Sequence, residues 1–250
     1  MKPKILFALL PVCFLFTSIT AQDFEGVVKL KNSAAEGVLT TFTIDGDLVL
    51  MEARAEEGLV KILTNTKTGI FYTLADTEKD KMAIKNDMNS PMMKMAAGQM
   101  KTNPDSMDDD VDVKVTGETK MISGYKCIKV IGSSDKVEGI AWIAKDLKLQ
   151  LSDLFPMAKI NAKEVNKKMR AALGVEGFVM EMHSTDKKTG EQFTMTAEVE
   201  EKSVTLDEAA ILEGYEIMDM TNIMKIMQEA QGDPAKLEKL KEMMKKSMNK

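Results

Sequence analysis

The sequence predicts a mainly β protein of the α+β class, built on one large curved antiparallel sheet or unclosed barrel of about nine to eleven strands. Short segments in which apolar and polar residues alternate recur between residues 26 and 200, and turn-forming residues separate them. Such alternation indicates a sheet with one wet face. The other face needs a cover, so we expect helices against its concave side.

A hairpin marks the start of the predicted sheet. Asp45-Gly46 is a strong two-residue turn signal, and alternating segments flank it on both sides. A second pair of segments follows, joined around Thr66-Lys67-Thr68. In this first part of the chain we expect strands at 26–31, 38–44, 48–53, 59–65 and 69–74.

Periodicity then fails in a methionine-rich insertion at about 81–110. Pro91 is typical of a helix start, so we expect one short helix at 92–101 and loop elsewhere. Methionine fills adaptable apolar surfaces, and this insertion is therefore predicted to act as a mobile apolar lid.

Strands resume with strict alternation after the insertion. We expect Gly117 to mark a turn, and Phe193, Met195, Ala197 and Val199 to face the core. A helical pattern covers 158–173 and stops at Gly174, and 206–210 is typical of a one-turn cap before 214–217. The predicted strands of this part are 111–116, 125–131, 139–144, 178–184 and 192–200.

The first 21 residues predict export. Lys2 and Lys4 precede an apolar run at 5–19 that is short for a membrane span, and Ala21 offers a small residue for cleavage. A lipoprotein signal at Cys13 would need a small residue before it, where Val12 stands. An uncleaved anchor helix is the other alternative. We expect a periplasmic protein, with secretion as the alternative.

Removal of Lys2 and Lys4 changes the formal net charge from −5 to −7, which argues against a nucleic-acid partner. Cys127 is then the only cysteine, so no internal disulfide can form. We expect Cys127 to be a small buried hydrophobe, with a reactive thiol as the alternative. Residues 22–220 are long enough for one domain with a packed core.

The tail at 221–250 differs from the rest of the chain. Apolar residues recur at helical spacing, among six lysines and two glutamates from Lys236 onward. This pattern predicts a basic amphipathic helix. It either packs loosely on the domain or makes peripheral contact with a membrane surface. Oligomeric state is not indicated.

Two motifs carry a family resemblance: Gly117–Cys127, which reads GETKMISGYKC, and Trp142–Leu147, which reads WIAKDL. Together with 24–26, 44–47 and 214–219, they resemble the exported proteins catalogued as domain of unknown function 4412, over about 24–220. Members usually carry basic residues where this chain has Leu48, Val49 and Leu50. The resemblance implies a fold like that of the lipoprotein carriers LolA and LolB, whose concave face accepts acyl chains. It implies no established activity.

The sequence offers few residues for catalysis or metal binding. His183 is the only histidine, and a Cys127–His183 pair is conceivable but not indicated by their spacing. One cysteine and one histidine cannot supply a zinc site. The run at 108–112 lacks the spaced ligands of a calcium loop and is typical of a solvated acidic loop. We therefore expect no enzyme activity, no cofactor and no metal.

The prediction is a non-catalytic extracytoplasmic module that holds a lipid, acyl chain or other apolar ligand in the concave sheet face. One alternative is an envelope structural or interaction protein that docks through its basic tail. Another is a Cu(I)-binding protein, because methionine thioethers are soft ligands. The predicted ligand-binding residues of the concave face and lid are Trp142, Tyr125, Phe42, Met92, Met93 and Met95.

Overall fold

In a computed structural model, the described residues are 24–33, 39–55, 58–76, 81–91, 93, 112–147, 149, 154 and 177–221. The predicted signal peptide at 1–21 and helix at 158–173 lie outside them. So do most of the methionine-rich insertion and the tail from 222 onward. Among the described residues, no helix has the length and apolar character needed to cross a bilayer.

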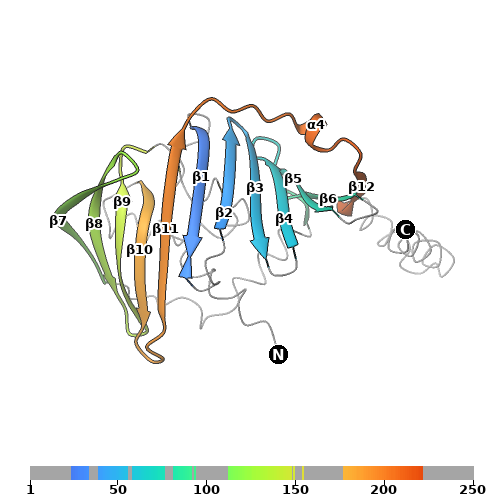
Figure 1. Ribbon diagram of the computed structural model, residues 1–250. Coiled ribbons are helices and arrows are strands. Elements are labelled where there is room, and N and C mark those ends of the chain that lie inside the picture. The colour runs from blue at the N-terminus through green and yellow to red at the C-terminus, as the bar shows by residue number, and fades with distance from the viewer. Residues whose placement is uncertain are drawn as a thin grey trace.

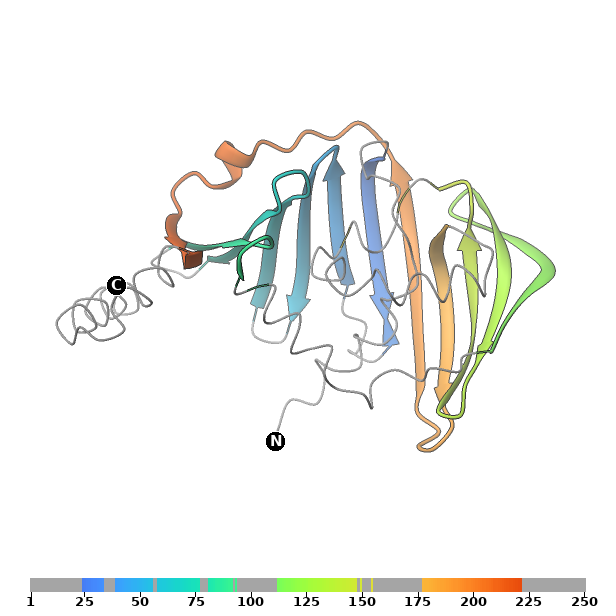
Figure 2. The same cartoon turned by 180° about the vertical axis from the view of Figure 1, so that it is seen from behind.

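Twelve strands form one mixed sheet, in the order β12-β6-β5-β4-β3-β2-β1-β11-β10-β9-β8-β7 (Figures 1 and 2). All neighbours are antiparallel except β12 and β6, which are parallel. Within the described part of the chain the sheet is open, with β7 and β12 at its edges. The strands are β1 Glu25–Asn32, β2 Leu39–Asp45, β3 Leu48–Ala55, β4 Gly58–Asn65, β5 Ile70–Asp76, β6 Lys81–Asp87, β7 Asp112–Ile122, β8 Tyr125–Ser133, β9 Val137–Ala144, β10 Phe178–Asp186, β11 Gln192–Glu201 and β12 Glu216–Asp219.

The mainly β prediction is confirmed, but the expected number of strands is too low. β6 occupies the start of the predicted insertion, where Lys81–Asp87 pairs with β5. β12 adds a four-residue strand near the end of the domain. Gly117 does not end a strand, because β7 continues through it to Ile122 and changes register against β8 between Val115 and Thr119. Gly117 lies within this register shift. In the sequence alone, a glycine that interrupts an alternating pattern indicates a turn just as well as an irregular strand.

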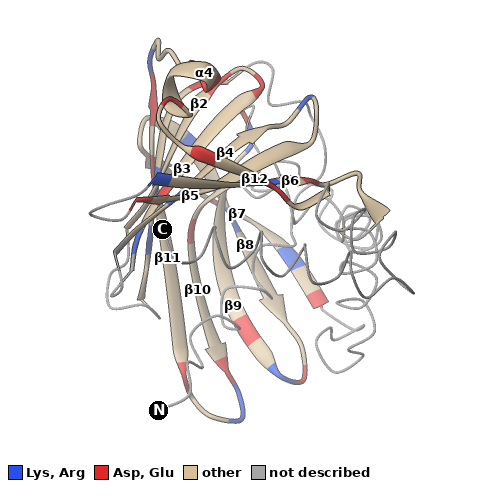
Figure 3. Ribbon diagram, turned by 90° about the vertical axis from the view of Figure 1, so that its right-hand side faces the viewer, with Lys and Arg blue, Asp and Glu red and all other residues tan. Residues whose placement is uncertain are grey.

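The sheet is curved (Figure 3), and much of the main core lies on one of its faces. Cross-strand partners share a face, so the pairs Val28–Phe42, Val28–Val199 and Leu30–Ala197 place one apolar row across β2, β1 and β11. We call this the inner face, and the opposite side the outer face. Phe42 and Val28 have no exposed surface. Leu147, Leu149 and Leu154 belong to the same buried cluster and help to close it.

A β-bulge widens this core at β10. The register against β9 shifts between Val179 and Glu181, which leaves Met180 without a direct partner. Three consecutive side chains, those of Phe178, Val179 and Met180, are all buried. Val179 pairs with Ile143, and the unpaired Met180 follows it, so the bulge allows these two consecutive side chains to lie on one face; Phe178 pairs with Ala144 on the opposite face.

A second, smaller core lies on the outer face, over β4 to β6. Leu63 pairs with Tyr72, and Leu74 pairs with Ala83, on the side opposite to Thr64 and Thr73. The cover is the segment 202–215, which we call the strap. It leaves β11, crosses the sheet and carries helix α4 at Glu208–Ile211 before reaching β12 (Figure 1). The strap packs against the second core through Ile211, Leu212 and Tyr215.

We expect Phe42→Ala to destabilise the protein by about 3–5 kcal/mol, because it removes a ring with no exposed surface and leaves a cavity. Met121→Ala is the matched control, since Met121 is 65% exposed and its truncation should cost less than about 0.5 kcal/mol. Urea unfolding of both variants measures the difference. Equal losses would contradict the placement of the main core.

Candidate functional site

Four of the predicted ligand-binding residues are described, and Phe42, Met93, Tyr125 and Trp142 lie at different places in the fold. Phe42 is fully buried within the main core, and Met93 is buried beside Ser90, whose hydroxyl accepts a hydrogen bond from the Met93 amide at 3.3 Å. Met92 and Met95 lie outside the described residues. Tyr125 and Trp142 lie in the β7–β10 half of the sheet. The fold therefore places these four residues at separate positions, although the prediction grouped them.

Trp142 lies on the outer face, although the prediction placed it on the core face with Phe42. It pairs with Lys129 on one side and with Glu181 on the other, while its neighbour Ala141 pairs with Val130 and Met182 of the inner face. The ring is half-buried and also packs against the main core cluster. The prediction failed because β9 reads Gly-Ile-Ala-Trp-Ile-Ala, a run with apolar residues in both alternating sets.

A charged network surrounds this tryptophan. Lys120 Nζ lies 4.4 Å from the centre of the Trp142 ring and donates to both carboxylate oxygens of Glu181 at 2.8 Å. His183 Nε2 lies 3.0 Å from Glu181 Oε1. Burial alone would raise the pKa of Glu181, but the bonds from Lys120 and His183 outweigh it and hold that pKa below its usual value. The ionised carboxylate is thus the centre of the network.

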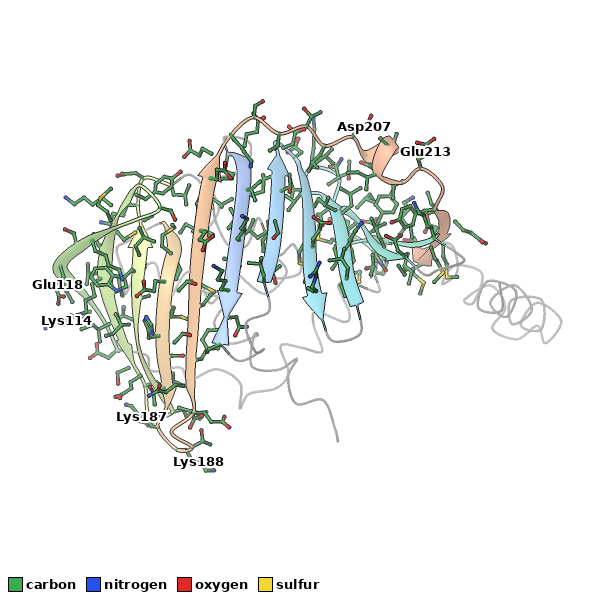
Figure 4. All side chains as sticks on the ribbon, in the orientation of Figure 1. Lys114, Glu118, Lys187, Lys188, Asp207 and Glu213 are labelled. Carbon is green, nitrogen blue, oxygen red and sulfur yellow. The ribbon has the colours of Figure 1, made fainter. Side chains whose placement is uncertain are left out.

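The same pattern continues toward the sheet edge, where Lys129 donates to both oxygens of Glu118 at 3.0 and 3.1 Å. Glu118 and Lys114 mark this end of the sheet in Figure 4. On β1 and β11, which pair with each other, Lys31 lies 2.6 Å from Glu198. Opposite charges that are this regularly paired form a solvated sheet surface.

The arrangement around Trp142 lacks an activated nucleophile. Burial raises the pKa of the Cys127 thiol, so the thiol stays protonated, and it donates to the Tyr125 carbonyl at 3.5 Å. Cys127 is fully buried, as predicted. His183 has Glu181 rather than Cys127 as its partner. Over the described residues, no group of three histidine, cysteine, aspartate or glutamate side chains could hold a metal ion.

The motif that carried the family resemblance has a structural explanation. Ser123 and Gly124 both have positive φ values, 47° and 83°, and form the tight turn between β7 and β8. Tyr125 follows directly and donates its hydroxyl to Glu201 of β11. Cys127 fills a position that is closed to solvent. These residues fix a hairpin and attach it to a distant strand.

A more accessible apolar surface lies on the inner face of β3 to β6. Met51 pairs with Ile62, Ile62 with Thr73, and Thr73 with Ile84. Phe71 and Met82 lie on the same face of β5 and β6. We call Met51, Ile62, Phe71, Met82 and Ile84 the inner strip. All five are half-buried, in contrast to the fully buried inner residues of β1 and β2. Sequence alternation was a usable signal for β4, but the prediction did not select these residues.

We expect Lys120→Met to change the emission of Trp142, because it removes a cation from the ring face and frees Glu181. The loss of stability should be about 1 kcal/mol, since both partners are partly exposed. Trp142 is the only tryptophan, so the fluorescence spectrum reports on this site alone. Lys126→Met, at an exposed position of β8, is the control. An identical effect of the two changes would contradict the cation–π contact.

We expect stability to fall above pH 10. Burial, followed by the bond to Asp76 at 2.5 Å, raises the pKa of Tyr215 from 10.0 to about 12. Burial and the Glu201 bond also raise the pKa of Tyr125. A raised pKa means that the folded state holds the proton more tightly, so this stability is complete below pH 10 and is lost as the pH rises toward 12. Urea unfolding from pH 8 to 11.5 measures it, and Tyr215→Phe should flatten the slope.

Comparisons with known proteins place these observations in a family. A family model described as domain of unknown function (DUF4412) matches residues 24–215. No curated protein matches the sequence.

Among solved structures, PNGF-II in a C2 crystal is 14% identical with a TM-score of 0.40, over 77% of this chain and 30% of that one. The chain therefore spans less than a third of the PNGF-II chain. A structure described as a lipoprotein of Parabacteroides distasonis is 12% identical with a TM-score of 0.23, over 75% and 98%. A domain of Vibrio parahaemolyticus, described as an outer membrane lipoprotein-sorting protein domain, is 9% identical with a TM-score of 0.18, over 74% and 87%. At these TM-scores the likenesses carry no argument. The family model covers most of the chain, and the protein belongs to the DUF4412 family of domains of unknown function.

Proposed function

We propose that the protein is a non-catalytic binding module that works outside the cytoplasm and holds a lipid, an acyl chain or another apolar ligand against the inner face of its sheet. The observation that carries this proposal is the inner strip of β3 to β6. Its five apolar side chains lie on one face and keep part of their surface accessible. The predicted signal peptide supports the compartment.

The location of the proposed ligand differs from the sequence-based expectation. Side chains of the protein itself fill the inner face over β1, β2 and β10, where Phe42, Val28 and Met180 have no exposed surface. A ligand would therefore lie over β3 to β6. Phe42 borders this surface, because it is the cross-strand neighbour of Met51 of the strip on the same face.

The chemistry of the strip favours an apolar ligand. Threonine is its main polar component: Thr73 sits between Ile62 and Ile84, and Thr64 is 98% buried next to Phe71. Contacts between a ligand and the apolar side chains of the strip would remove apolar surface from water, which stabilises a complex by about 25 cal/mol per Å². Apolar pockets with few polar groups are typical of sites for small molecules and lipids.

Two other functions remain predictions from the sequence. Docking through the basic tail depends on residues 222–250, and Cu(I) binding depends on Met92 and Met95, all outside the described part of the chain. Met93, the described member of that cluster, is buried. No observation on the described residues favours either function over the first.

The first test is native mass spectrometry of the mature protein, purified gently from its own envelope. We expect a discrete added mass that is lost on organic extraction and is identified as a lipid. A bare protein mass in repeated preparations would contradict the proposal.

The second test locates the ligand with paired variants. Ile62→Ser with Ile84→Ser should weaken the binding of a fluorescent fatty acid by about 10- to 30-fold, since each change removes about 1 kcal/mol of apolar contact. Leu59→Ser with Ile217→Ser is the matched control on the outer face, where these side chains are 47% and 49% exposed. Equal weakening in both pairs, with intact folds by urea unfolding, would exclude the inner strip as the site.

A further inference from the structure

The strap is fastened to the sheet by hydrogen bonds to carboxylates. At its start, Glu25 of β1 accepts from the Ser203 hydroxyl at 2.9 Å and from the Val204 amide at 2.7 Å. One strand further on, Asp45 of β2 accepts from the Leu206 amide at 2.9 Å. Both acceptors come from residues far away in the sequence, so these bonds hold the strap to the sheet.

Helix α4 in the middle of the strap depends on acidic residues as well. Asp207 caps it and accepts from the amides of Ala209 and Ala210 at 2.9 and 3.2 Å. Asp207 and Glu213 lie on either side of this single turn in Figure 4. Glu208 faces Tyr72 of the second core and helps to raise the pKa of that phenol, after burial as the larger cause.

The far end of the strap has the same chemistry. Asp76 of β5 accepts from the Tyr215 hydroxyl at 2.5 Å, and Lys61 Nζ lies 3.5 Å from its other oxygen. Lys81 lies 5.5 Å from the centre of the Tyr215 ring. In β12, Asp219 accepts from Lys85 of β6 at 2.9 Å. Asp219 also accepts from the Thr221 amide at 3.0 Å, so the groups that bond to these two carboxylates are a phenol, ammonium groups and an amide.

These bonds have one requirement in common, which is an ionised acceptor. Charge-assisted hydrogen bonds are about twice as strong as neutral ones, and protonation of the carboxylates removes that advantage. What then holds the strap is the packing of Ile211, Leu212 and Tyr215 and a four-residue parallel strand. The rest of the sheet is held by long backbone ladders and a buried core. Acid should therefore weaken the strap before it weakens the sheet.

We propose that residues 202–219, the strap together with β12, form an acid-released clasp: at low pH the hydrogen bonds to carboxylates that fasten it weaken, that of Asp76 among them, and the strap detaches and uncovers the second core while the remaining sheet stays folded. The clasp covers the outer face, so it is independent of ligand binding on the inner face. A loss of stability in acid is the direction expected from Asp76, because its hydrogen bond from Tyr215 is the main cause that lowers its pKa. A lowered pKa stabilises the fold above the ordinary value of 3.8, and this stability is lost as the pH falls below it.

Hydrogen exchange of the full mature chain tests the clasp. Amide protection, corrected for intrinsic exchange at each pH, is measured by mass spectrometry from about pH 6 down to about pH 2, because the stability is lost below the ordinary pKa of the carboxylates. Peptides from 203–219 should lose at least about tenfold in protection, since several charge-assisted hydrogen bonds weaken together. Peptides from β1, β10 and β11 should keep their protection. Loss of protection in all peptides together, or in none, would overturn the proposal.

A triple variant separates release from general acid unfolding. Glu25→Gln, Asp45→Asn and Asp76→Asn keep an acceptor oxygen at each position but carry no charge and cannot take up a proton. The protection of the strap should therefore be lower than in the unaltered protein at pH 6, and acid should change it by less than about threefold. The matched control changes exposed carboxylates on β9 and the neighbouring turns, with Asp135→Asn, Glu138→Gln and Glu191→Gln. It should release the strap on acidification as the unaltered protein does. A loss on acidification in the triple variant as large as in the unaltered protein, with β1, β10 and β11 still protected, would also overturn the proposal.

Discussion

The presence of apolar side chains on both faces of β4 and β5 is the constraint on which the rest of this structure depends. Leu63 on the outer face has 1% of its surface exposed, and Thr64, the next residue, has 2% exposed on the inner face. A strand with solvent on one side would need only one cover. Here the strap covers the outer face, so the end of the domain must fold back to strands formed much earlier in the chain, while the inner face carries the half-buried inner strip. The strap and β12 follow from that requirement.

The two faces differ in how they are stabilised, and this separates their roles. The main core combines fully buried side chains from β1, β2, β10 and β11 with a bulge that places Val179 and Met180 on one face. The second core is small, and its cover relies on hydrogen bonds to carboxylates. Local opening of proteins begins where apolar contacts are few. The rigid half of the inner face can thus support a ligand surface, while the outer cover can open separately.

The outer surface around Trp142 also shows why an aromatic residue on a sheet need not mark a ligand site. Lys120 occupies the ring face and Glu181 neutralises Lys120, so the polar groups satisfy one another. The cation and the carboxylate hold the ring in place across β7, β9 and β10. The candidate ligand surface is instead made of ordinary side chains, Ile62 and Ile84 among them, whose only distinction is the exposure left to them by the fold.

The sequence by itself determined most of the strands, the turn at Asp45-Gly46, the buried character of Cys127 and the single helical turn of α4, expected at 206–210, because these depend on neighbours within a few residues. It could not settle the face of Trp142, since Ala141 and Ile143 beside it are equally apolar. It read Gly117 as a turn, because a bulge and a turn use the same residue type. Only the tertiary structure decided the second core, the position of the inner strip and the attachment of the strap to Glu25 and Asp45. The attachment of the strap depends on hydrogen bonds between residues 161 and 179 positions apart, and no local pattern encodes it. The exposure of each strand face likewise depends on what the rest of the chain packs against it.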